Sequence, residues 1–472
     1  MPIASRRPWT SSSDRTTRTA QGHLKQREGS GRREGSLEAP TRHALAWNSA
    51  DFWNRDSLER ELERVFEICH GCRRCFSLCN SFPVLFDRID QSDSGELASV
   101  PKTAYQEVVD HCYLCDMCYM SKCPYVPPHE WNVDFPQLML RAKAVRFRRQ
   151  GAGFRDRLLS STDVVGRIAG IPVVNEIVNA ANRNRVGRRL LERALGVHAE
   201  ARLPEYHATS FRKHEARRAR PAITATPTSQ TTGKVALFTT CYCNRNEPEI
   251  LADLVAVLEH NGIPVSLPAQ ERCCGMPKLE LGDLASVAAL KEKNIPGLAA
   301  LVASGHDILA PVPSCVLMFK SELPLMFPDD PEVRRVAQRT YDPFEYLMLR
   351  HAEGRLATEF RASLGKVAYQ VPCHLRVQNI GLKTRDLLGL VPGTTLTTIE
   401  RCSGHNGSYA VKSEFHEASM KIGRPVVQKV ETAAADHYAS DCPMAGHQIA
   451  SGLGRTREPE HPIRLLRLAY EI

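Results

Sequence analysis

The stretch KVALFTT, residues 234–240, is an apolar and β-branched segment that ends immediately before Cys241. A segment of this kind is typical of a buried β-strand. The stretch KVAYQV, residues 366–371, has the same character and is followed two residues later by Cys373. The sequence therefore predicts two buried strands that each lead into a cysteine.

Helical and strand patterns alternate after both of these segments. After the first they predict a helix over 248–262, a strand over 263–268, helices over 284–294 and 297–305, and a strand over 307–312. After the second they predict a helix over 384–390, a strand over 394–399, a helix over 417–434 and a strand over 437–440. This alternation predicts a duplicated α/β domain with largely parallel sheets, residues 233–350 and 351–472.

Cysteines follow the predicted strands at matching places in both units. They are Cys241, Cys273, Cys274 and Cys315 in the first unit, and Cys373, Cys402 and Cys442 in the second. Ligands gather beyond the carboxyl ends of strands in open α/β sheets. We therefore expect each set of cysteines to converge on one site.

Eight more cysteines lie in two dense groups nearer the N-terminus. The group CHGCRRCFSLCN, residues 69–80, has the spacing C-x2-C-x2-C-x3-C, and CYLCDMCYMSKCP, residues 112–124, has C-x2-C-x2-C-x4-C. In two-cluster ferredoxins the fourth cysteine of such a run ligates the other [4Fe-4S] cluster. The predicted ligand sets are Cys69, Cys72, Cys75 and Cys123 for one cluster, and Cys112, Cys115, Cys118 and Cys79 for the other.

Zinc is the competing interpretation of these groups. Structural zinc sites usually take separated C-x2-C pairs, so the run of three cysteines favours iron. The apolar positions of SLERELERVFEI, residues 57–68, predict a helix that leads into the first group. The 32 residues between the two groups exceed what a compact bacterial ferredoxin uses. They favour a helical ferredoxin domain, which spans residues 49–145.

The cysteine count also bears on the compartment. The chain has sixteen Cys among 472 residues, and no apolar run follows Arg6-Arg7 to make an export signal. No apolar run of about 18 residues occurs, so we expect no membrane-spanning helix. A cytoplasmic chain keeps its thiols reduced, which favours metal binding over a disulfide framework.

Charge is unevenly distributed along the chain. Residues 51–140 have a net charge of −7, and residues 141–220 have a net charge of +12. Residues 1–48 are rich in Arg, Ser and Thr and are predicted to be a disordered tail. Residues 146–232 are predicted to be a basic helical connector and linker. This pattern does not indicate a nucleic-acid-binding protein. The acidic block could dock on a basic face of a protein partner. The basic stretch is either a solvated helical face or a surface that contacts an acidic partner or anionic lipid at the inner face of the membrane.

The motifs CHGCRRCFSLCN, CYLCDMCYMSKCP, RCCGMP (272–277) and RCSGHNG (401–407) resemble those of the superfamily of heterodisulfide reductase and the C-subunit of anaerobic glycerol-3-phosphate dehydrogenase. Its members combine two 4Fe-4S ferredoxin motifs with two cysteine-rich CCG domains. They include iron–sulfur subunits of glycolate oxidase and lactate-utilisation systems. Residues 111–144 further resemble a bacterial branch of heterodisulfide reductase-related iron–sulfur proteins, which is often linked with rubrerythrin-type peroxide reductases.

The resemblance implies a five-cysteine noncubane cluster in each CCG domain. The first domain would supply Cys241, Cys273, Cys274 and Cys315, with Met318 at the fifth position and Cys243 as a replacement. The second would supply Cys373, Cys402 and Cys442, with Ser403 and Ala445 where cysteines are expected. A third iron–sulfur cluster is therefore expected in the first domain. The second either binds three thiolates with a further ligand such as His374 or His405, or only completes the fold.

These features imply an oxidoreductase component in electron transport. The sequence has no flavin or nicotinamide fingerprint, so we expect a subunit that passes single electrons between a partner flavoprotein dehydrogenase and a further acceptor. The partner would be of the glycerol-3-phosphate, glycolate or lactate type. The alternatives are a disulfide reductase or electron donor to a rubrerythrin-type peroxide reductase, and a zinc-stabilised binding protein.

Overall fold

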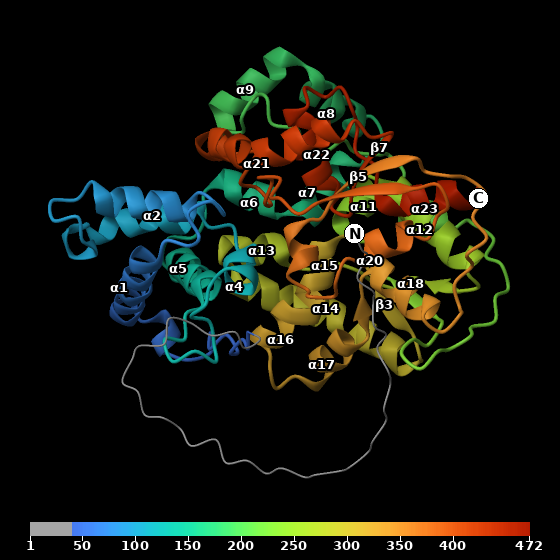
Figure 1. The fold of residues 1–472 in the computed structure, drawn as a ribbon, viewed down its shortest axis with the longest axis horizontal. Helices are drawn as coiled ribbons and strands as arrows, with labels where there is room; N and C mark the ends of the chain where they lie inside the picture. The colour runs from blue at the N-terminus through green and yellow to red at the C-terminus, as the bar shows by residue number, and fades with distance from the viewer. Residues whose placement is uncertain (1–39) are drawn as a thin grey trace, which may run out of the picture.

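The computed structural model describes residues 40–472 of the chain (Figure 1). Most of the predicted disordered tail, residues 1–39, lies outside the described residues. Its last part, residues 40–48, packs onto the protein: the Leu45 N–H donates to the Leu325 carbonyl at 2.8 Å, and the Trp47 indole donates to the Met326 carbonyl at 2.8 Å. Leu45 is buried, and Trp47 lies edge-on against Phe327.

The N-terminal part is helical, as the pattern of residues 57–68 predicts. Leu58, Leu62, Val65 and Phe66 form the buried face of the first long helix, and Phe82 packs on Phe135 with ring centroids 4.6 Å apart. The elements are η1 (Asp51–Trp53), α1 (Arg55–Cys72), α2 (Ser81–Asp90), η2 (Leu97–Ser99), η3 (Lys102–Ala104), α3 (Tyr105–His111), α4 (Met117–Ser121) and α5 (Phe135–Gln150).

Short helices occupy the basic region. They are α6 (Phe154–Ser160), α7 (Thr162–Ala169), α8 (Val174–Arg183), α9 (Arg185–Leu195) and α10 (Phe211–Glu215). Within residues 40–472 no helix alone has the length and apolar character to cross a bilayer, whereas α7 and α8, bent 106° apart, meet those criteria when taken together. Residues 221–232 form neither helix nor strand.

The first α/β unit has a parallel sheet in the order β2-β1-β3-β4. Its strands are β1 (Val235–Leu237), β2 (Val265–Ser266), β3 (Asp307–Leu309) and β4 (Thr340–Tyr341). Its helices are α11 (Cys241–Arg245), α12 (Pro248–His260), α13 (Met276–Leu281), α14 (Leu284–Ala303), α15 (Pro313–Leu317), η4 (Met318–Glu322), α16 (Leu323–Met326), α17 (Pro331–Gln338) and α18 (Pro343–His351). The two helices expected over 284–305 are one continuous helix, α14, because burial of Ile295, Leu298 and Ala299 holds the turn around Pro296 in place.

The second unit repeats the plan with a parallel sheet in the order β6-β5-β7. Its elements are β5 (Lys366–Gln370), α19 (Cys373–Arg376), α20 (Lys383–Leu388), β6 (Thr395–Ile399), α21 (Ser413–Ala433), β7 (His437–Ser440), α22 (Pro443–Gly452) and α23 (Pro462–Tyr470). The last helix packs back on α12 of the first unit, where Arg467 donates to Asp253 at 2.6 Å. The mixed helical and parallel-sheet fold predicted from the sequence is therefore confirmed.

Candidate functional site

The first thiol group forms where α1 ends. Cys69 and Cys72 lie on the last turn of α1, and the chain then turns through Arg73, whose backbone is left-handed with φ 51°. Burial and the neighbouring thiols of Cys123, Cys75 and Cys72 raise the pKa of Cys69 well above its usual range. The four cysteines assigned together from their spacing therefore lie together.

The second thiol group forms around the start of α4. Leu114 and Asp116 both have positive φ, of 53° and 58°, and so wrap the loop tightly between its cysteines. Burial and the thiols of Cys115, Cys112, Cys75 and Cys79 raise the pKa of Cys118 well above its usual range. The set predicted from spacing, which comprises Cys112, Cys115, Cys118 and Cys79, is thus brought together. Its edge lies near Cys75 of the first group.

The third group lies beyond the carboxyl ends of β1, β2 and β3. The thiols of Cys273 and Cys315 raise the pKa of Cys274 well above its usual range, and the same two thiols neighbour Cys241. Two residues of α7 support the group: the Thr162 hydroxyl donates to the Cys273 sulfur at 3.4 Å, and the Asp163 carboxylate accepts from the Cys273 N–H at 2.5 Å. These bonds fix both the thiol and the backbone of Cys273.

The fourth group lies at the same edge of the second sheet. Burial and the thiols of Cys402 and Cys442 raise the pKa of Cys373 well above its usual range. The Cys402 sulfur accepts from the Gly404 N–H at 3.3 Å, and the hydroxyl of Tyr113 lies 3.7 Å from the same sulfur. The three predicted cysteines of the second unit are therefore neighbours.

Two histidines beside the fourth group have a ring nitrogen without a partner among the described residues. These are the Nε2 atoms of His374 and His405. His374 is held through Nδ1 by the Ser314 hydroxyl at 2.7 Å, and burial lowers the pKa of His405 to about 4. Ser403 and Ala445, which replace the expected cysteines, are both buried near these residues. Neutral imidazole nitrogens are therefore available where thiolates are missing.

The four groups form a series in which a thiol of each group influences the pKa of a thiol in the next. The second group adjoins the fourth, because the thiols of Cys373 and Cys402 help to raise the pKa of Cys115. The fourth adjoins the third through Cys243, a buried thiol whose pKa is raised chiefly by burial and Glu247, with Cys315 and Cys442 contributing. The order in space is first, second, fourth, third. This order differs from the order along the chain.

A cavity of about 870 Å³ lies between the third and fourth groups. Cysteines of both units line it, and α6–α9 supply an apolar roof that includes Val165, Val178, Leu191 and Leu195. The fourth group therefore has the second group on one side and this cavity on the other.

Sequence reasoning missed three supporting residues. Arg42 donates to Asp116, the residue between Cys115 and Cys118, at 2.6 Å. Lys143 of α5 is buried and donates to the Cys112 carbonyl. Thr162 lies in the basic connector, 111 residues before its partner Cys273. No local pattern marks these residues, since each acts through a contact that only the tertiary fold creates.

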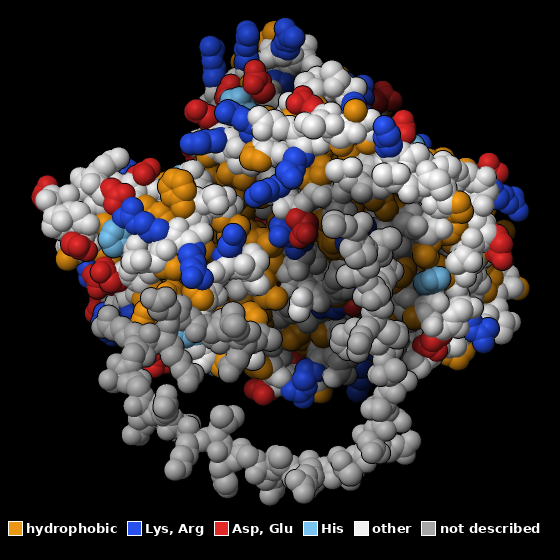
Figure 2. All heavy atoms as spheres, in the orientation of Figure 1, with side chains coloured by type: hydrophobic (Ala, Val, Ile, Leu, Met, Phe, Trp, Pro, Cys, Tyr) orange, Lys and Arg blue, Asp and Glu red, His pale blue; other side chains and the backbone are white. Residues whose placement is uncertain are grey.

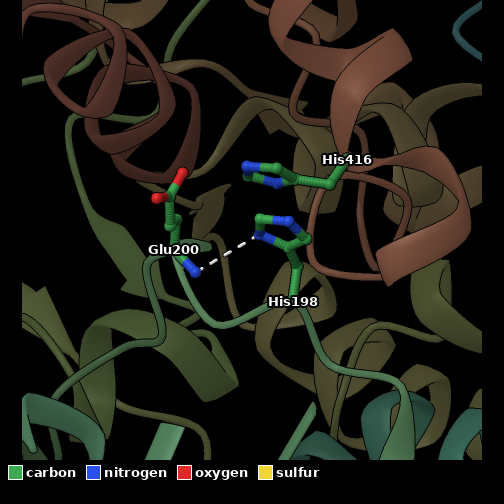
Figure 3. Close-up of side chains that lie close together, drawn as sticks. All are labelled: His198, Glu200 and His416. Atoms are coloured by element: carbon green, nitrogen blue, oxygen red, sulfur yellow. Dashed lines mark hydrogen bonds between the residues drawn. The ribbon is translucent and has the colours of Figure 1, made fainter. Parts of the chain in front are cut away.

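A separate cluster of His198, Glu200 and His416 brings its nitrogen and oxygen atoms within 4.8 Å of one another (Figure 3). The two imidazole rings are stacked, with centroids 3.8 Å apart and planes 14° apart. The His198 Nδ1 accepts from the Glu200 N–H at 3.2 Å. An imidazole binds a metal in its own ring plane, which two stacked parallel rings cannot do toward one ion. We therefore interpret the cluster as a packing contact between the connector and α21.

Comparison with known proteins agrees with this arrangement. The family model "Cysteine-rich domain" (CCG) matches residues 235–320 and 367–450, which are the two α/β units. The C-subunit of anaerobic glycerol-3-phosphate dehydrogenase from Escherichia coli (strain K12) is 29% identical over 344 residues, covering 72% of this chain and 82% of that protein. The B-subunit of fumarate reductase (CoM/CoB) from Methanothermobacter marburgensis is 23% identical over 401 residues, covering 81% of this chain and 68% of that protein.

Lactate utilization protein A of Bacillus cereus (strain G9842) is 30% identical over 219 residues, covering 44% of this chain and 87% of that protein. The resemblance indicated by the four cysteine motifs is therefore confirmed. With two CCG domains and relatives of these three kinds, the chain belongs to the iron–sulfur protein superfamily of heterodisulfide reductase and the C-subunit of anaerobic glycerol-3-phosphate dehydrogenase.

Proposed function

We propose that this protein is an iron–sulfur electron-transfer subunit. It relays single electrons between a partner flavoprotein dehydrogenase, of the glycerol-3-phosphate, glycolate or lactate type, and a further acceptor. The observation that carries this proposal is the series of four neighbouring thiol groups: thiols of the first two influence one another, Tyr113 next to Cys112 reaches Cys402 at 3.7 Å, and cysteines of the third and fourth groups line one cavity. A series of neighbouring one-electron centres is what a relay requires, whereas a single isolated centre would not connect two partners.

The proposed cofactors are two [4Fe-4S] clusters and a third iron–sulfur cluster. The first two are held by the cysteine sets of the helical part, which we propose to be a two-cluster ferredoxin domain. The third is held by Cys241, Cys273, Cys274 and Cys315. The chemistry of the donors fits this assignment, because thiolates buried beside other thiolates need a cation to offset their charge. We propose that Cys373, Cys402 and Cys442 form a weaker site.

Thiol spacing argues against the zinc alternative. Four sulfur ligands of a tetrahedral zinc, each about 2.3 Å from the metal, lie about 3.8 Å from one another. Within residues 40–472, no three of the sixteen thiols have their sulfur atoms all within 4.8 Å of one another. A cubane carries its thiolates on separate irons and holds them farther apart. The spacing therefore favours clusters over mononuclear zinc.

The named relatives suggest the kind of partner. Two of them are subunits of a dehydrogenase and a reductase by name, and we propose that this chain likewise works beside a redox protein. The acidic ferredoxin part, residues 51–140, would dock on a basic face of that partner. We place the chain in the cytoplasm, in peripheral contact with the inner face of the membrane through the basic region 141–220.

The cavity between the third and fourth groups favours a second candidate function. A space of about 870 Å³ that reaches cysteines of both CCG domains could admit a small disulfide for reduction. Two-site disulfide cleavage needs clusters in both domains, and Ser403 and Ala445 remove two ligands from the second. Reduction of small disulfides by the dithionite-reduced protein would favour this function over the relay. Electron delivery to a rubrerythrin-type peroxide reductase would need no such reaction.

Iron and sulfide counting after anaerobic purification tests the proposal. We expect about twelve irons per chain, falling to about eight in Cys274→Ser and remaining near twelve in the control Met318→Leu. On dithionite reduction, paramagnetic resonance should show [4Fe-4S] signals broadened by their neighbours. Abundant zinc with no such signal would refute the proposal, and about eight irons in the wild type would refute the third cluster.

A further inference from the structure

Exposed apolar side chains gather in one part of the protein. Of the twelve large apolar residues that are exposed among residues 40–472, nine lie between Phe154 and Leu190. Soluble surfaces scatter such residues singly, and a concentration of them marks an interaction surface. The nine are Phe154, Leu158, Val164, Ile168, Ile171, Val173, Ile177, Val186 and Leu190.

These helices carry apolar residues beyond the side that lines the cavity. On α8, Val174 and Val178 line the cavity, whereas Ile177, 63% exposed, faces outward. On α9, Leu191 and Leu195 line the cavity, whereas Leu190 is 60% exposed. A helix that is apolar on its outer side as well as its inner side normally has that outer side covered. Nothing in residues 40–472 covers the outer sides of α8 and α9.

The charge around this surface is basic. The segment from α6 to α9 carries eight Arg, no Lys and four Asp or Glu. Arg157, Arg167, Arg185, Arg189 and Arg193 are exposed and form no ion pair within residues 40–472. Figure 2 shows basic side chains standing out where α9 lies, at the top of the view. Apolar residues interleaved with unpaired Arg are the pattern of a helix that lies in an anionic lipid interface.

We propose that the outer face of α6–α9 inserts into the interface of an anionic bilayer. Seven of the nine exposed apolar residues enter the acyl boundary, the exceptions being Leu158 and Ile168, which line the cavity. The five unpaired Arg contact lipid phosphates. The proposal deepens, and rests on, the peripheral membrane contact of residues 141–220. It confines that contact to residues 154–193 and excludes the basic residues around α10. It also places the helices that roof the cavity, α6–α9, between the cavity and the lipid.

Two other occupants of this face have different signatures. A second copy of the chain would be attracted by the apolar residues but repelled by the unpaired Arg of the opposing face. A protein partner would need an acidic and apolar surface and would bind equally without lipid. The excess of unpaired positive charge makes the anionic bilayer the better complement.

Vesicle co-sedimentation of the anaerobically purified full-length protein tests the proposal. We expect binding to phosphatidylcholine vesicles that contain phosphatidylglycerol, and much weaker binding to phosphatidylcholine alone. The double variant Ile177→Gln/Leu190→Gln should bind at least about tenfold more weakly. The matched control Leu468→Gln/Ile472→Gln, which removes two exposed apolar residues on and after α23, should bind as the wild type does.

The charge is tested separately by Arg185→Gln/Arg189→Gln. We expect about a tenfold loss of binding to the anionic vesicles and no change with phosphatidylcholine alone. Unaltered binding by both double variants would overturn the proposal. So would lipid-free sedimentation velocity that shows a dimer which Ile177→Gln/Leu190→Gln dissociates. Iron and sulfide counts on the same samples separate a failure of the membrane-binding proposal from a failure of the electron-transfer proposal. The electron-transfer proposal predicts the full iron and sulfide content in every variant.

Discussion

Replacing Arg42 by Met should destabilise the helical N-terminal part strongly. The Arg42 guanidinium lies between two carboxylates and makes four hydrogen bonds, to Asp134 at 2.8 and 3.0 Å and to Asp116 at 2.6 and 3.0 Å. All three side chains are largely buried, with exposed fractions of 15% for Arg42, 7% for Asp116 and 16% for Asp134. The variant would leave two buried carboxylates without their cation.

The expected cost follows from that burial. Removing one partner of a buried ion pair costs about 3–5 kcal/mol, because the remaining charge is left uncompensated. With a urea m-value of about 2 kcal/mol/M, the unfolding midpoint of this part should fall by about 2 M. Met keeps most of the volume of Arg, so the loss reports on charge rather than on a cavity.

Anaerobic urea titration, followed by far-ultraviolet circular dichroism and by the visible absorbance of the clusters, measures this midpoint. Both signals should shift together, since Asp116 lies between Cys115 and Cys118. The control is Arg55→Met, which breaks an exposed pair with Glu59 at 2.6 Å and should cost no more than about 0.5 kcal/mol. If Arg42→Met and Arg55→Met shift the midpoint equally, the burial argument is wrong.

Three further predictions concern other buried groups. Burial raises the pKa of Glu322 to about 8, so the native state loses stability as pH rises from about 4.3 toward 8. In thermal unfolding, the free energy of unfolding of Glu322→Gln should exceed that of the wild type by at least about 2 kcal/mol at pH 9, but not at pH 4. Thr162→Val removes the hydrogen bond to the Cys273 sulfur and should lower the reduction potential of that centre by about 40 mV in a redox titration, with iron content unchanged. Burial lowers the pKa of His461, which contacts the Pro311 carbonyl, to about 4. Stability is therefore lost as pH falls from about 6.5 toward 4, and the wild type should lose about 2 kcal/mol more than His461→Gln between pH 7 and pH 5 in the same unfolding assay.

The regular elements of the CCG domains could be predicted because each is encoded locally. Every strand expected from KVALFTT onward is present, and the main helices follow their apolar periodicity. The continuous α14 departs from expectation because long-range packing outweighs the local effect of Pro296. Strand β4 is only two residues long and has no pattern of its own.

The candidate site divides in the same way. Spacing alone grouped the eight N-terminal cysteines into two sets of four, and the strand ends grouped the other seven. No spacing rule predicts that Cys402 lies beside Tyr113 or that Asp163 accepts from the Cys273 N–H. Such contacts join segments that are 289 and 110 residues apart, so they depend on how whole domains pack.

The arrangement gives the degenerate fourth group an importance that its sequence does not indicate. It has lost two of five expected cysteines, yet it lies between the second group and the cavity that leads to the third. A unit that only completed the fold would have no need to keep Cys373, Cys402 and Cys442 close together, or to leave the Nε2 atoms of His374 and His405 without partners beside them. We propose that electrons passing from the helical part to the first CCG domain use this group, although α5 of the helical part also packs directly on α13 of that domain. The thiols and imidazoles retained there fit such a role.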